Sequence, residues 1–360
     1  MRICLISMGT FTHIGPYLDY FKQAGHDVHF IAMSPGPERG VPTYNVGLGR
    51  RYSETHGKWK YPISMLRARR LIKELKPDIV HAHYATSCGL TALACGFHPT
   101  VVTAHGSDLT TGIKSRIWRP LLKRVFEFAD CVNTVSKDLE EMAVSLGIEP
   151  NKIETLTLGI DTGKFAFTDR PGLHSSRALR LVCTRRLEPV FDHPTIIGAL
   201  ARLKEKRIEF RMTFVGDGSL LDTLKRRAGD VGLNSSVSFT DRVNNDDLPE
   251  ILGQNDVYLS ASLWDGTSLS LLEAMATGLF PIVSDIKANS ALLKHNVDGL
   301  LHNVGDADDL AKCILWLYEH PQLAAGAARR NRQKVIESAD RQKNLKRLES
   351  LFEKLIEKRR

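Results

Sequence analysis

The sequence has no long hydrophobic run and no leader-like start. No stretch reaches about 18 uninterrupted apolar residues, the length that a membrane-spanning helix needs. The chain opens on the strand-like MRICLISMGT and not on a basic segment followed by a long apolar one. We therefore expect neither a signal peptide nor a membrane span.

Cysteine is scarce, and its spacing excludes a disulfide framework. No two of the six cysteines form a CxxC pair, and most stand inside apolar runs. This pattern is typical of reduced core residues, so we expect a cytoplasmic protein. The six are Cys4, Cys88, Cys95, Cys131, Cys183 and Cys313.

The net charge of +8 is concentrated in two basic clusters of the first half. The stretch from Arg50 to Lys76 holds nine Lys or Arg against two Glu, with Trp59 and Tyr61 among them, and the stretch from Lys114 to Arg124 holds five around Trp118. Each cluster could be a solvated helix face, or could touch anionic lipid headgroups, an anionic acceptor or nucleic acid. The aromatic residues favour a peripheral membrane surface, on its cytoplasmic face, or an anionic acceptor, and no nucleic acid is expected.

Apolar runs alternate with helical patterns along the whole chain, which at 360 residues is longer than one hydrophobic core usually serves. Such alternation predicts parallel sheets with helices on both faces. The predicted fold class is α/β, with two Rossmann-like domains whose parallel sheets face each other across a cleft. The runs include ICLISM, VHFIAM, DIVHAHY, TVVTAH and CVNTVS in the first half, and LRLVCT, RMTFVGDG, VSFT, VYLSASL and LFPIVSD in the second.

Two stretches interrupt this alternation. Residues 35–62 are rich in Gly, Pro and charge and predict a long functional loop with one short strand at TYNVGL. Turn formers at 158–176 indicate an interdomain linker. The predicted organisation is a first domain over 1–165, a linker over 166–178, a second domain over 179–340, and a charged helix over 341–360 that could return to the first domain.

The segment Val257–Asp285 holds the largest group of candidate binding residues. It predicts a strand, the turn cluster WDGTS, a helix and a second strand. In a parallel sheet this turn lies at the carboxyl ends of the strands, and the helix start offers unpaired N–H groups to an anion. We expect Gly266, Thr267, Ser268 and Leu269 to face a phosphate or carboxylate.

Two acids accompany this anion site, Asp265 just before the helix and Glu273 within it. Ser270, Glu273 and Thr277 share one side at helical spacing, so Glu273 could belong to a solvent-facing stripe. The helix is otherwise Leu, Ala and Met between apolar strands, which favours a functional role for Glu273.

Two other strand ends of the second half offer anion-binding groups. Arg185 and Arg186 follow the strand LRLVCT, and a planar guanidinium suits a diphosphate. We expect one of them to be structural and paired with a carboxylate such as Glu188 or Asp192. A Gly-rich turn follows the next strand, with Gly216 and Gly218 placed for backbone approach to a phosphate, although Gly-Asp-Gly is also an ordinary turn.

In the first half, His105 ends the strand TVVTAH and should reach the same edge of its sheet. His81 and His83 alternate along DIVHAHY and share one face. Single histidines are most often hydrogen-bonded structural residues. A metal site built from the three is disfavoured, because no carboxylate or Cys stands at ligand spacing beside them.

The first strand leads into a Gly-containing loop and a helix, a geometry suited to contact a second substrate. Its candidate acceptor-binding residues are Gly9, Thr10, His13 and Gly15.

Together these motifs resemble the retaining glycosyltransferases of the GT-B fold, glycosyltransferase family 4. The family has an Arg-Leu after the first strand of its second domain, here Arg186-Leu187, and a Val-Gly-Asp-Gly turn, here from Val215 to Gly218. It also has an acid, seven residues and then Glu before Ala-Met-Ala-x-Gly, here from Asp265 to Gly278. The likeness covers nearly the full chain, since His105-Gly106 matches in the first half.

The resemblance implies hexose transfer from a nucleoside diphosphate sugar held by the second domain. Glu273 would bind the ribose hydroxyls, Arg186 and the N–H groups from Thr267 to Leu269 the diphosphate, Asp265 the sugar hydroxyls, and His105 the sugar from the other domain. The anomeric configuration would be retained, with the leaving phosphate deprotonating the acceptor, and fixed donors would stabilise the charge on that phosphate. No metal or cofactor is implied. The first domain would bind the acceptor, a glycan, a lipid-linked or a small molecule.

Two departures from the family pattern leave alternatives open. Asp265 stands where the family usually has Glu, and Phe191 where it usually has Lys five residues after the Arg. We expect Arg185 to supply the second cation. The alternatives are an epimerase or phosphorylase of the same fold, or a catalytically decayed protein that still binds sugar nucleotides.

Overall fold

The computed structural model describes residues 1–8, 14–34, 39–47, 61–169 and 178–359. The chain divides into two compact units: unit 1 is Met1–Leu158 with Gln342–Arg360, and unit 2 is Gly159–Arg341. The division falls earlier than the predicted boundary at 165. Ile160 pairs with Asp340 in an isolated bridge and Phe165 is fully buried in a core cluster of unit 2, so residues 159–165 pack with the second unit.

Unit 1 is built on a seven-stranded sheet in the order β3-β2-β1-β4-β5-β6-β7, and each neighbouring pair is parallel. Its elements are β1 (Arg2–Ser7), α1 (Gly15–Gln23), β2 (Asp27–Ala32), β3 (Thr43–Asn45), α2 (Tyr61–Leu75), β4 (Ile79–His83), α3 (Ser87–Cys95), β5 (Thr100–Ala104), α4 (Ser107–Gly112), α5 (Trp118–Phe128), β6 (Cys131–Thr134), α6 (Lys137–Ser145), η2 (Pro150–Lys152), β7 (Ile153–Thr155) and, from the end of the chain, α14 (Arg341–Glu357). The predicted strand at TYNVGL is confirmed as β3, and residues 35–38 and 48–60 of the expected loop lie outside the described part of the chain.

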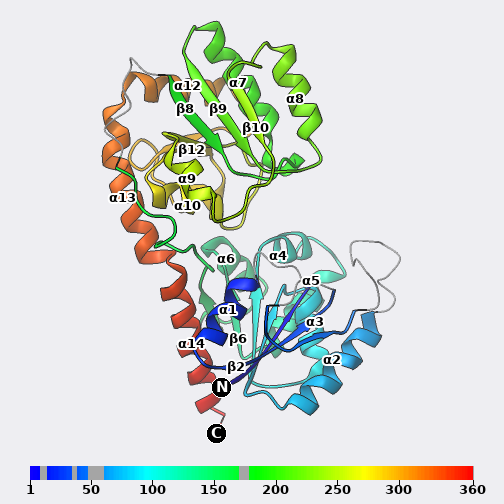
Figure 1. Ribbon diagram of the computed structural model, residues 1–360. Coiled ribbons are helices and arrows are strands. Elements are labelled where there is room, and N and C mark those ends of the chain that lie inside the picture. Colours follow the sequence, from blue (N-terminus) through cyan, green and yellow to red (C-terminus); the bar gives the residue numbers. More distant parts are fainter. Residues whose placement is uncertain (9–13, 35–38, 48–60, 170–177, 360) are drawn as a thin grey trace. The chain divides into compact units, whose positions relative to one another are not determined.

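Unit 2 is built on a six-stranded parallel sheet in the order β10-β9-β8-β11-β12-β13. Its elements are β8 (Leu179–Cys183), η3 (Pro189–Phe191), α7 (His193–Glu205), β9 (Phe210–Val215), α8 (Leu221–Asp230), β10 (Val237–Thr240), α9 (Leu248–Gly253), β11 (Val257–Ser260), α10 (Leu269–Thr277), β12 (Phe280–Ser284), α11 (Lys287–Ser290), β13 (Leu300–His302), α12 (Ala307–Glu319) and α13 (Gln322–Ser338). The predicted α/β class with two Rossmann-like parallel sheets is confirmed (Figure 1).

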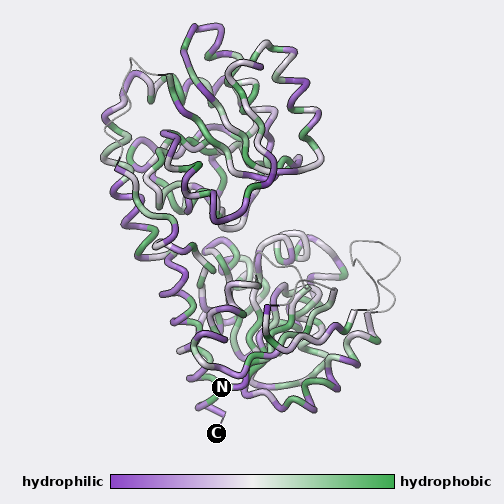
Figure 2. Tube along the Cα trace, viewed as in Figure 1, coloured by the Kyte–Doolittle hydropathy of each residue, from purple (hydrophilic) through white to green (hydrophobic). Residues whose placement is uncertain are grey.

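The central strands of both sheets are buried on both faces, which explains why they are mostly apolar. In β1, Cys4 and Ile6 join a core cluster with α2, α3 and α5, whereas Ile3 and Leu5 join a second cluster with α1 and α14. Unit 2 repeats this arrangement, with one cluster under α7, α8 and α12 and another under α10 and α13. Figure 2 shows hydrophobic residues concentrated on the strands, and hydrophilic residues alternating with hydrophobic ones along the helices.

The C-terminal helix α14 belongs to the core of unit 1. Its apolar side chains include Phe352, which stacks on Phe21 of α1 with ring centroids 5.3 Å apart. Glu349 of the same helix accepts hydrogen bonds from the Tyr20 hydroxyl at 2.7 Å and pairs with His26 at 2.6 Å. These contacts join the two ends of the chain within one unit.

All six cysteines are unpaired, as predicted, and five of them are buried. Within the described ranges, none of the helices combines the length and the apolar composition that crossing a bilayer requires.

Candidate functional site

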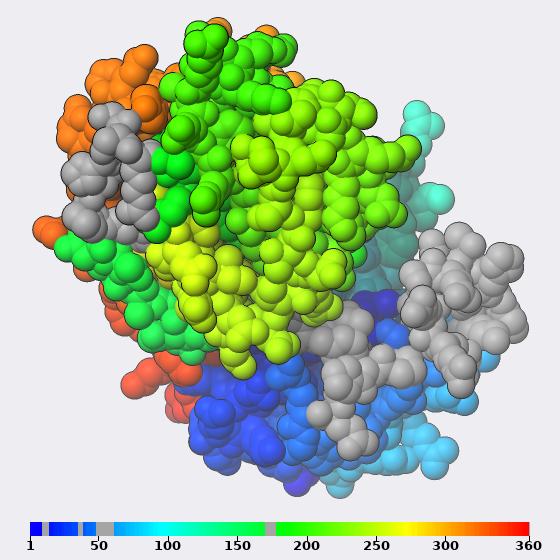
Figure 3. Space-filling view, turned by 45° about the horizontal axis from the view of Figure 1, so that its top comes forward, coloured from blue at the N-terminus to red at the C-terminus, as the bar shows by residue number. Residues whose placement is uncertain are grey.

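The predicted site residues of unit 2 gather at the carboxyl edge of its sheet. Strands β9, β8 and β11 are neighbours, so the segments that follow them meet at one edge. Loops after β10 and β11 lie at the surface of unit 2, where Figure 3 shows them in yellow-green and yellow. The sheet order thus brings together Arg185, Gly216 and Asp265, which stand far apart in the sequence.

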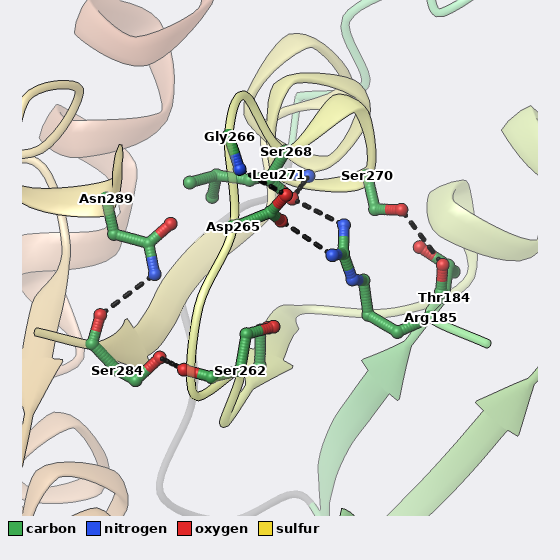
Figure 4. Close-up of polar contacts among 11 residues, drawn as sticks. Thr184, Arg185, Ser262, Asp265, Gly266, Ser268, Ser270, Leu271, Ser284 and Asn289 are labelled. Atoms are coloured by element: carbon green, nitrogen blue, oxygen red, sulfur yellow. Dashed lines mark hydrogen bonds and ion pairs between the residues drawn. The ribbon is translucent and has the colours of Figure 1, made fainter. Parts of the chain in front are cut away.

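Arg185 lies at the centre of this edge and is almost completely buried (Figure 4). Its Nη2 donates to Asp265 Oδ2 at 2.6 Å, and its Nη1 donates to Ser268 Oγ at 3.0 Å. The guanidinium carbon lies 4.1 Å from the centre of the Phe191 ring. A buried cation is therefore held beside the start of α10 by a carboxylate, a hydroxyl and an aromatic face.

Arg186, in contrast to the buried Arg185, lies at the surface. Its side chain is 69% exposed, and it pairs with Glu188 at 3.2 Å. Glu188 also accepts hydrogen bonds from the Ser219 backbone and hydroxyl, which together with Arg186 hold the pKa of its carboxyl below the ordinary value. The arginine with the predicted Glu188 partner is thus Arg186, and Arg185 pairs with Asp265, which we did not predict.

The start of α10 has the geometry of an anion-binding helix end. Ser268 caps the helix: its Oγ accepts the N–H of Leu271 at 3.2 Å and its carbonyl accepts the N–H of Leu272 at 3.1 Å. The N–H groups of Leu269 and Ser270 precede the first intrahelical bonds and face the same end. This end carries a partial positive charge beside the Arg185 cation.

Two further hydrogen bonds order this region, one within the turn and one between α10 and the end of β8 (Figure 4). Asp265 Oδ1 accepts the N–H of Gly266 at 2.8 Å, and Ser270 Oγ donates to the carbonyl of Thr184 at 2.9 Å. The loop and the helix start are therefore rigidly tied to the end of β8. Thr267 lies between Gly266 and Ser268 in the same turn.

Glu273 is buried in α10, with 9% of its surface exposed. Among the described residues its carboxylate has no hydrogen-bond or ion-pair partner. Burial raises the pKa of Glu273 to about 7, against the opposing charges of Arg341, Lys164 and Arg185. The alternative of a solvent-facing stripe is wrong, because Thr277 one turn later is buried as well.

The two glycines after β9 are required by packing between two loops. A Cβ on Gly216 would lie 2.8 Å from the Arg185 carbonyl oxygen, and one on Gly218 would lie 2.3 Å from that of Leu187. Their φ angles of +143° and +159° also disfavour other residues. The Asp217 carbonyl accepts the N–H of Leu187 at 2.8 Å, which locks the loops together. The Gly-Asp-Gly turn thus shapes the segment that carries Arg185, and ligand contact by its glycines stays a prediction.

In unit 1, His105 lies at the carboxyl edge of its own sheet. Its Nε2 lies 3.1 Å from His83 Nδ1, and its ring centroid lies 4.7 Å from that of Tyr84, which has a left-handed φ of +75°. A non-glycine residue in this conformation is typical of functional sites.

Asp108 organises the backbone around His105, a role that we missed in the sequence. Its buried carboxylate accepts the N–H groups of Ala85, His105, Gly106 and Leu109 at 2.7 to 3.3 Å. Burial raises the pKa of Asp108, and these four N–H groups oppose that rise. The available signal was an acid three residues after a strand-end histidine.

His81 is a structural residue. It is fully buried, its Nε2 lies 2.7 Å from Thr103 Oγ1, and burial lowers its pKa to about 3. Across the part of the chain that the structure describes, no group of three His, Cys, Asp or Glu could hold a metal ion.

Of the predicted acceptor-binding residues, only Gly15 falls within the described ranges. It is the buried first residue of α1, and a Cβ there would lie 2.5 Å from the Arg39 guanidinium carbon. Gly9, Thr10 and His13 lie outside the described residues.

His193 is a second residue that the sequence did not single out. It begins α7 and is fully buried next to Phe191 and Phe214, with ring centroids 6.5 and 5.6 Å away. Burial and the Arg185 charge lower its pKa to about 4. A neutral His193 therefore adds no second positive charge beside Arg185.

Known proteins match both halves of the chain. Residues 168–339 match the family described as glycosyl transferases group 1, and residues 9–164 match glycosyltransferase family 4. The chain is 30% identical over 277 residues to the UDP-Gal:alpha-D-GlcNAc-diphosphoundecaprenol alpha-1,3-galactosyltransferase of Escherichia coli, covering 70% of this chain and 69% of that protein. It is 27% identical over 342 residues to the phosphatidyl-myo-inositol mannosyltransferase of Mycolicibacterium smegmatis, covering 91% and 85%.

Solved structures share the fold. HepE from Anabaena, solved in complex with UDP, aligns with a TM-score of 0.81 at 17% identity and covers 99% of this chain and 100% of that one. Sucrose-phosphate synthase from Thermosynechococcus elongatus aligns with a TM-score of 0.81 at 17% identity, covering 99% of each chain. Two parallel-sheet units and these matches define the class as GT-B glycosyltransferases. Within that class, the chain belongs to the glycosyl transferases group 1, family 4.

Proposed function

We propose that this glycosyltransferase moves a hexose from a nucleoside diphosphate sugar to an acceptor, with retention at the anomeric carbon and without a metal ion or cofactor. Unit 2 binds the donor, and unit 1 binds the acceptor. The observation that carries the proposal is Glu273, a buried carboxylate without a partner among the described residues, beside a helix start and a buried arginine.

A carboxylate in this position suits the ribose of a nucleotide. Each oxygen of Glu273 accepts a hydrogen bond, and adjacent ribose hydroxyls supply two donors in the same plane. The N–H groups from Thr267 to Leu269, with Arg185 and Arg186, bind the diphosphate that follows the ribose. The ligand thereby supplies hydrogen-bond donors to the buried Glu273 carboxylate.

The same groups support the chemical step. Negative charge develops on the departing diphosphate, and the fixed cation and N–H groups stabilise it without rearrangement. Asp265 contacts the sugar hydroxyls, and His105 contributes from unit 1. The departing phosphate oxygen accepts the proton of the acceptor hydroxyl, so no separate general base is needed.

The donor assay is a panel of UDP, GDP and ADP hexoses with and without acceptors. We expect diphosphate release that depends on one donor, survives EDTA and yields a product with the donor's anomeric configuration by NMR. HepE has also been solved with UDP-glucose, which makes UDP-glucose the first donor to test. No release from any donor, with nucleotide binding intact, would indicate a decayed binding protein.

Two substitutions test the donor contacts. Glu273→Ala and Arg186→Ala should each weaken donor binding by at least about tenfold, the loss of one charge-assisted hydrogen bond. The matched control is Glu250→Ala, which removes an exposed acid on α9. Unchanged donor affinity in either site variant would remove that residue from the donor site.

We propose further that the acceptor is lipid-linked and that the protein acts on the cytoplasmic face of a membrane. Two relatives act on lipid-borne acceptors by their names, a diphosphoundecaprenol and a phosphatidyl-myo-inositol. Unit 1 also presents a basic surface, defined as the exposed cations of α2 and of residues 114–124 around the start of α5: Arg67, Arg69, Arg70, Lys73, Lys114, Arg116, Arg119, Lys123 and Arg124.

Exposed apolar side chains stand among these cations. Leu66 is 66% exposed and Ile117 is 73% exposed, with Ile63 and Trp118 beside them. Helices α2 and α5 pack through one core cluster on the same face of the sheet, so both parts of the basic surface belong to one side of unit 1 (Figure 1). Cations with apolar and aromatic residues between them fit an anionic lipid surface. The cations from Arg50 to Lys60 lie outside the described residues.

Vesicle sedimentation tests this contact. The protein should sediment with phosphatidylglycerol vesicles at low salt and remain in solution with phosphatidylcholine vesicles. Leu66→Ser with Ile117→Ser should reduce sedimentation, whereas Val304→Ser, which changes an apolar residue of unit 2 that is 44% exposed, should not. Failure to sediment with anionic vesicles at any salt concentration would contradict the proposal.

A further inference from the structure

Phe191 has an uncharged side chain next to the proposed donor site, and its ring contacts the side chain of Arg185. The ring ends η3 and lies against the Arg185 guanidinium at 4.1 Å. The backbone on both sides of the ring is hydrogen-bonded: the N–H of Phe191 donates to the Glu188 carbonyl at 3.0 Å, and the N–H of Leu263 donates to the Val190 carbonyl at 2.9 Å. The second bond ties η3 to the loop that carries Asp265.

Arg185 is consequently held on three sides. Ser268 binds its Nη1 and Asp265 its Nη2, and its guanidinium carbon lies over the face of the Phe191 ring. Only two of its five N–H groups are used in these bonds, and the buried Nε has no partner among the described residues. A buried guanidinium whose remaining N–H groups lie beside the start of α10 can bind an anion there.

We infer that Phe191 is a positioning residue for the diphosphate: its ring holds Arg185 in the orientation in which the remaining N–H groups meet the donor's phosphates. This inference rests on the proposed function. A ring face attracts a cation most strongly where water is excluded, as it is around Arg185. In the family that the chain resembles, Lys stands at this position, whereas here an aromatic ring acts through the neighbouring arginine.

Two substitutions distinguish the contribution of the aromatic ring face of residue 191 from that of its apolar volume. Phe191→Leu removes the ring face and keeps an apolar side chain, and Phe191→Tyr keeps the ring face. We expect Phe191→Leu to weaken binding of a nucleoside diphosphate by about 5- to 30-fold, the range of one desolvated cation–π contact. Phe191→Tyr should bind as the unsubstituted protein does.

The probe is whichever of UDP, GDP and ADP binds best, compared by calorimetry with its nucleoside and with inorganic pyrophosphate. The nucleoside lacks phosphates, so its affinity should be equal in all variants and reports an intact fold. Phe239→Leu is the matched control, because Phe239 is also half-buried in unit 2 but stacks on Phe214. It should leave both affinities unchanged.

A double-substitution cycle tests whether the ring acts through Arg185. Arg185→Gln should weaken diphosphate binding, and adding Phe191→Leu should then have no further effect, because the cation that the ring positions is gone. In the same background Phe191→Lys should restore part of the diphosphate affinity by placing a cation directly at the site.

Three results distinguish the inference from the proposed function. Equal diphosphate affinity in the Leu, Tyr and unsubstituted proteins overturns the inference and leaves the proposed function standing. Selective loss in Phe191→Leu without any sugar transfer overturns the proposed function and supports the diphosphate clamp. No binding of pyrophosphate or any nucleoside diphosphate by the unsubstituted protein overturns both.

Discussion

At the scale of single residues, Glu273, the proposed ribose ligand, is a buried carboxylate whose ionisation lowers the stability of the fold. A carboxylate buried without a partner is costly to ionise, which is why its pKa rises to about 7 from an ordinary value of 4.5. Below pH 4.5 the group is protonated in the folded and the unfolded chain and contributes nothing. Between the two pKa values only the unfolded chain ionises, so stability falls as the pH rises, and above pH 7 the penalty is complete.

Glu273→Gln should therefore be more stable than the unsubstituted protein at pH 8, by about 3 kcal/mol, with little difference near pH 4. The glutamine keeps the shape and cannot ionise. Urea unfolding of both proteins at pH 4, 6 and 8 measures this difference. Equal stability at pH 8 would show that the carboxylate is solvated in the folded protein.

Under the proposed function Arg185 binds the diphosphate, and because Asp265 already pairs with Arg185, we expect the carboxylate to compete with the diphosphate. Asp265→Asn should tighten nucleoside diphosphate binding several-fold, because the carboxylate no longer neutralises the guanidinium at 2.6 Å. Turnover should fall at least about tenfold with the loss of the sugar contact. Calorimetry and steady-state kinetics check the two effects separately.

The control for this variant is Asp256→Asn, which breaks the Arg180–Asp256 pair elsewhere in unit 2. It should change neither affinity nor turnover. Weaker diphosphate binding in Asp265→Asn would mean that the carboxylate orients Arg185 more than it neutralises it.

At the scale of elements, the loops after β8 and β9 form one unit because glycine lets their backbones meet. Gly218→Ala places a Cβ 2.3 Å from the Leu187 carbonyl oxygen, and Gly305→Ala meets no atom within 4 Å, although both glycines have positive φ. We expect Gly305→Ala to cost about 1–2 kcal/mol from its backbone conformation alone. Gly218→Ala should cost at least about 2 kcal/mol more, because the loops must move apart.

Chemical unfolding of the two variants measures the difference. The displacement in Gly218→Ala should also reach Arg185, whose carbonyl the same turn contacts, so diphosphate affinity should fall in this variant and not in Gly305→Ala. Equal stabilities would show that the two loops separate readily.

At the scale of the whole molecule, the last helix completes the core of the first unit. Phe352→Ala should destabilise unit 1 by about 3–5 kcal/mol, because the ring is fully buried against Phe21. Hydrogen exchange should accelerate in β1, β2 and β4. The strands of unit 2 should exchange as before, and faster exchange there would show that the two units unfold together.

Periodicity in the sequence was sufficient for the fold class and for the positions of the strand ends. The central parallel strands are mostly apolar and are followed by helical patterns, and the carboxyl ends of such strands must share one edge. The chemistry of that edge in unit 2 could accordingly be predicted from three segments. The strand β7 was not predicted, because it has only three half-buried residues at the edge of its sheet.

The partners of individual side chains were decided by the tertiary structure alone. Whether Arg185 or Arg186 turns inward depends on Asp265 and Ser268, which stand about eighty positions away and approach only when β11 pairs with β8. The same holds for Asp108, whose role depends on N–H groups at the ends of two strands. Local sequence determines which elements form and where they end, but a side chain's burial and partners depend on which distant segments the sheet order brings beside it.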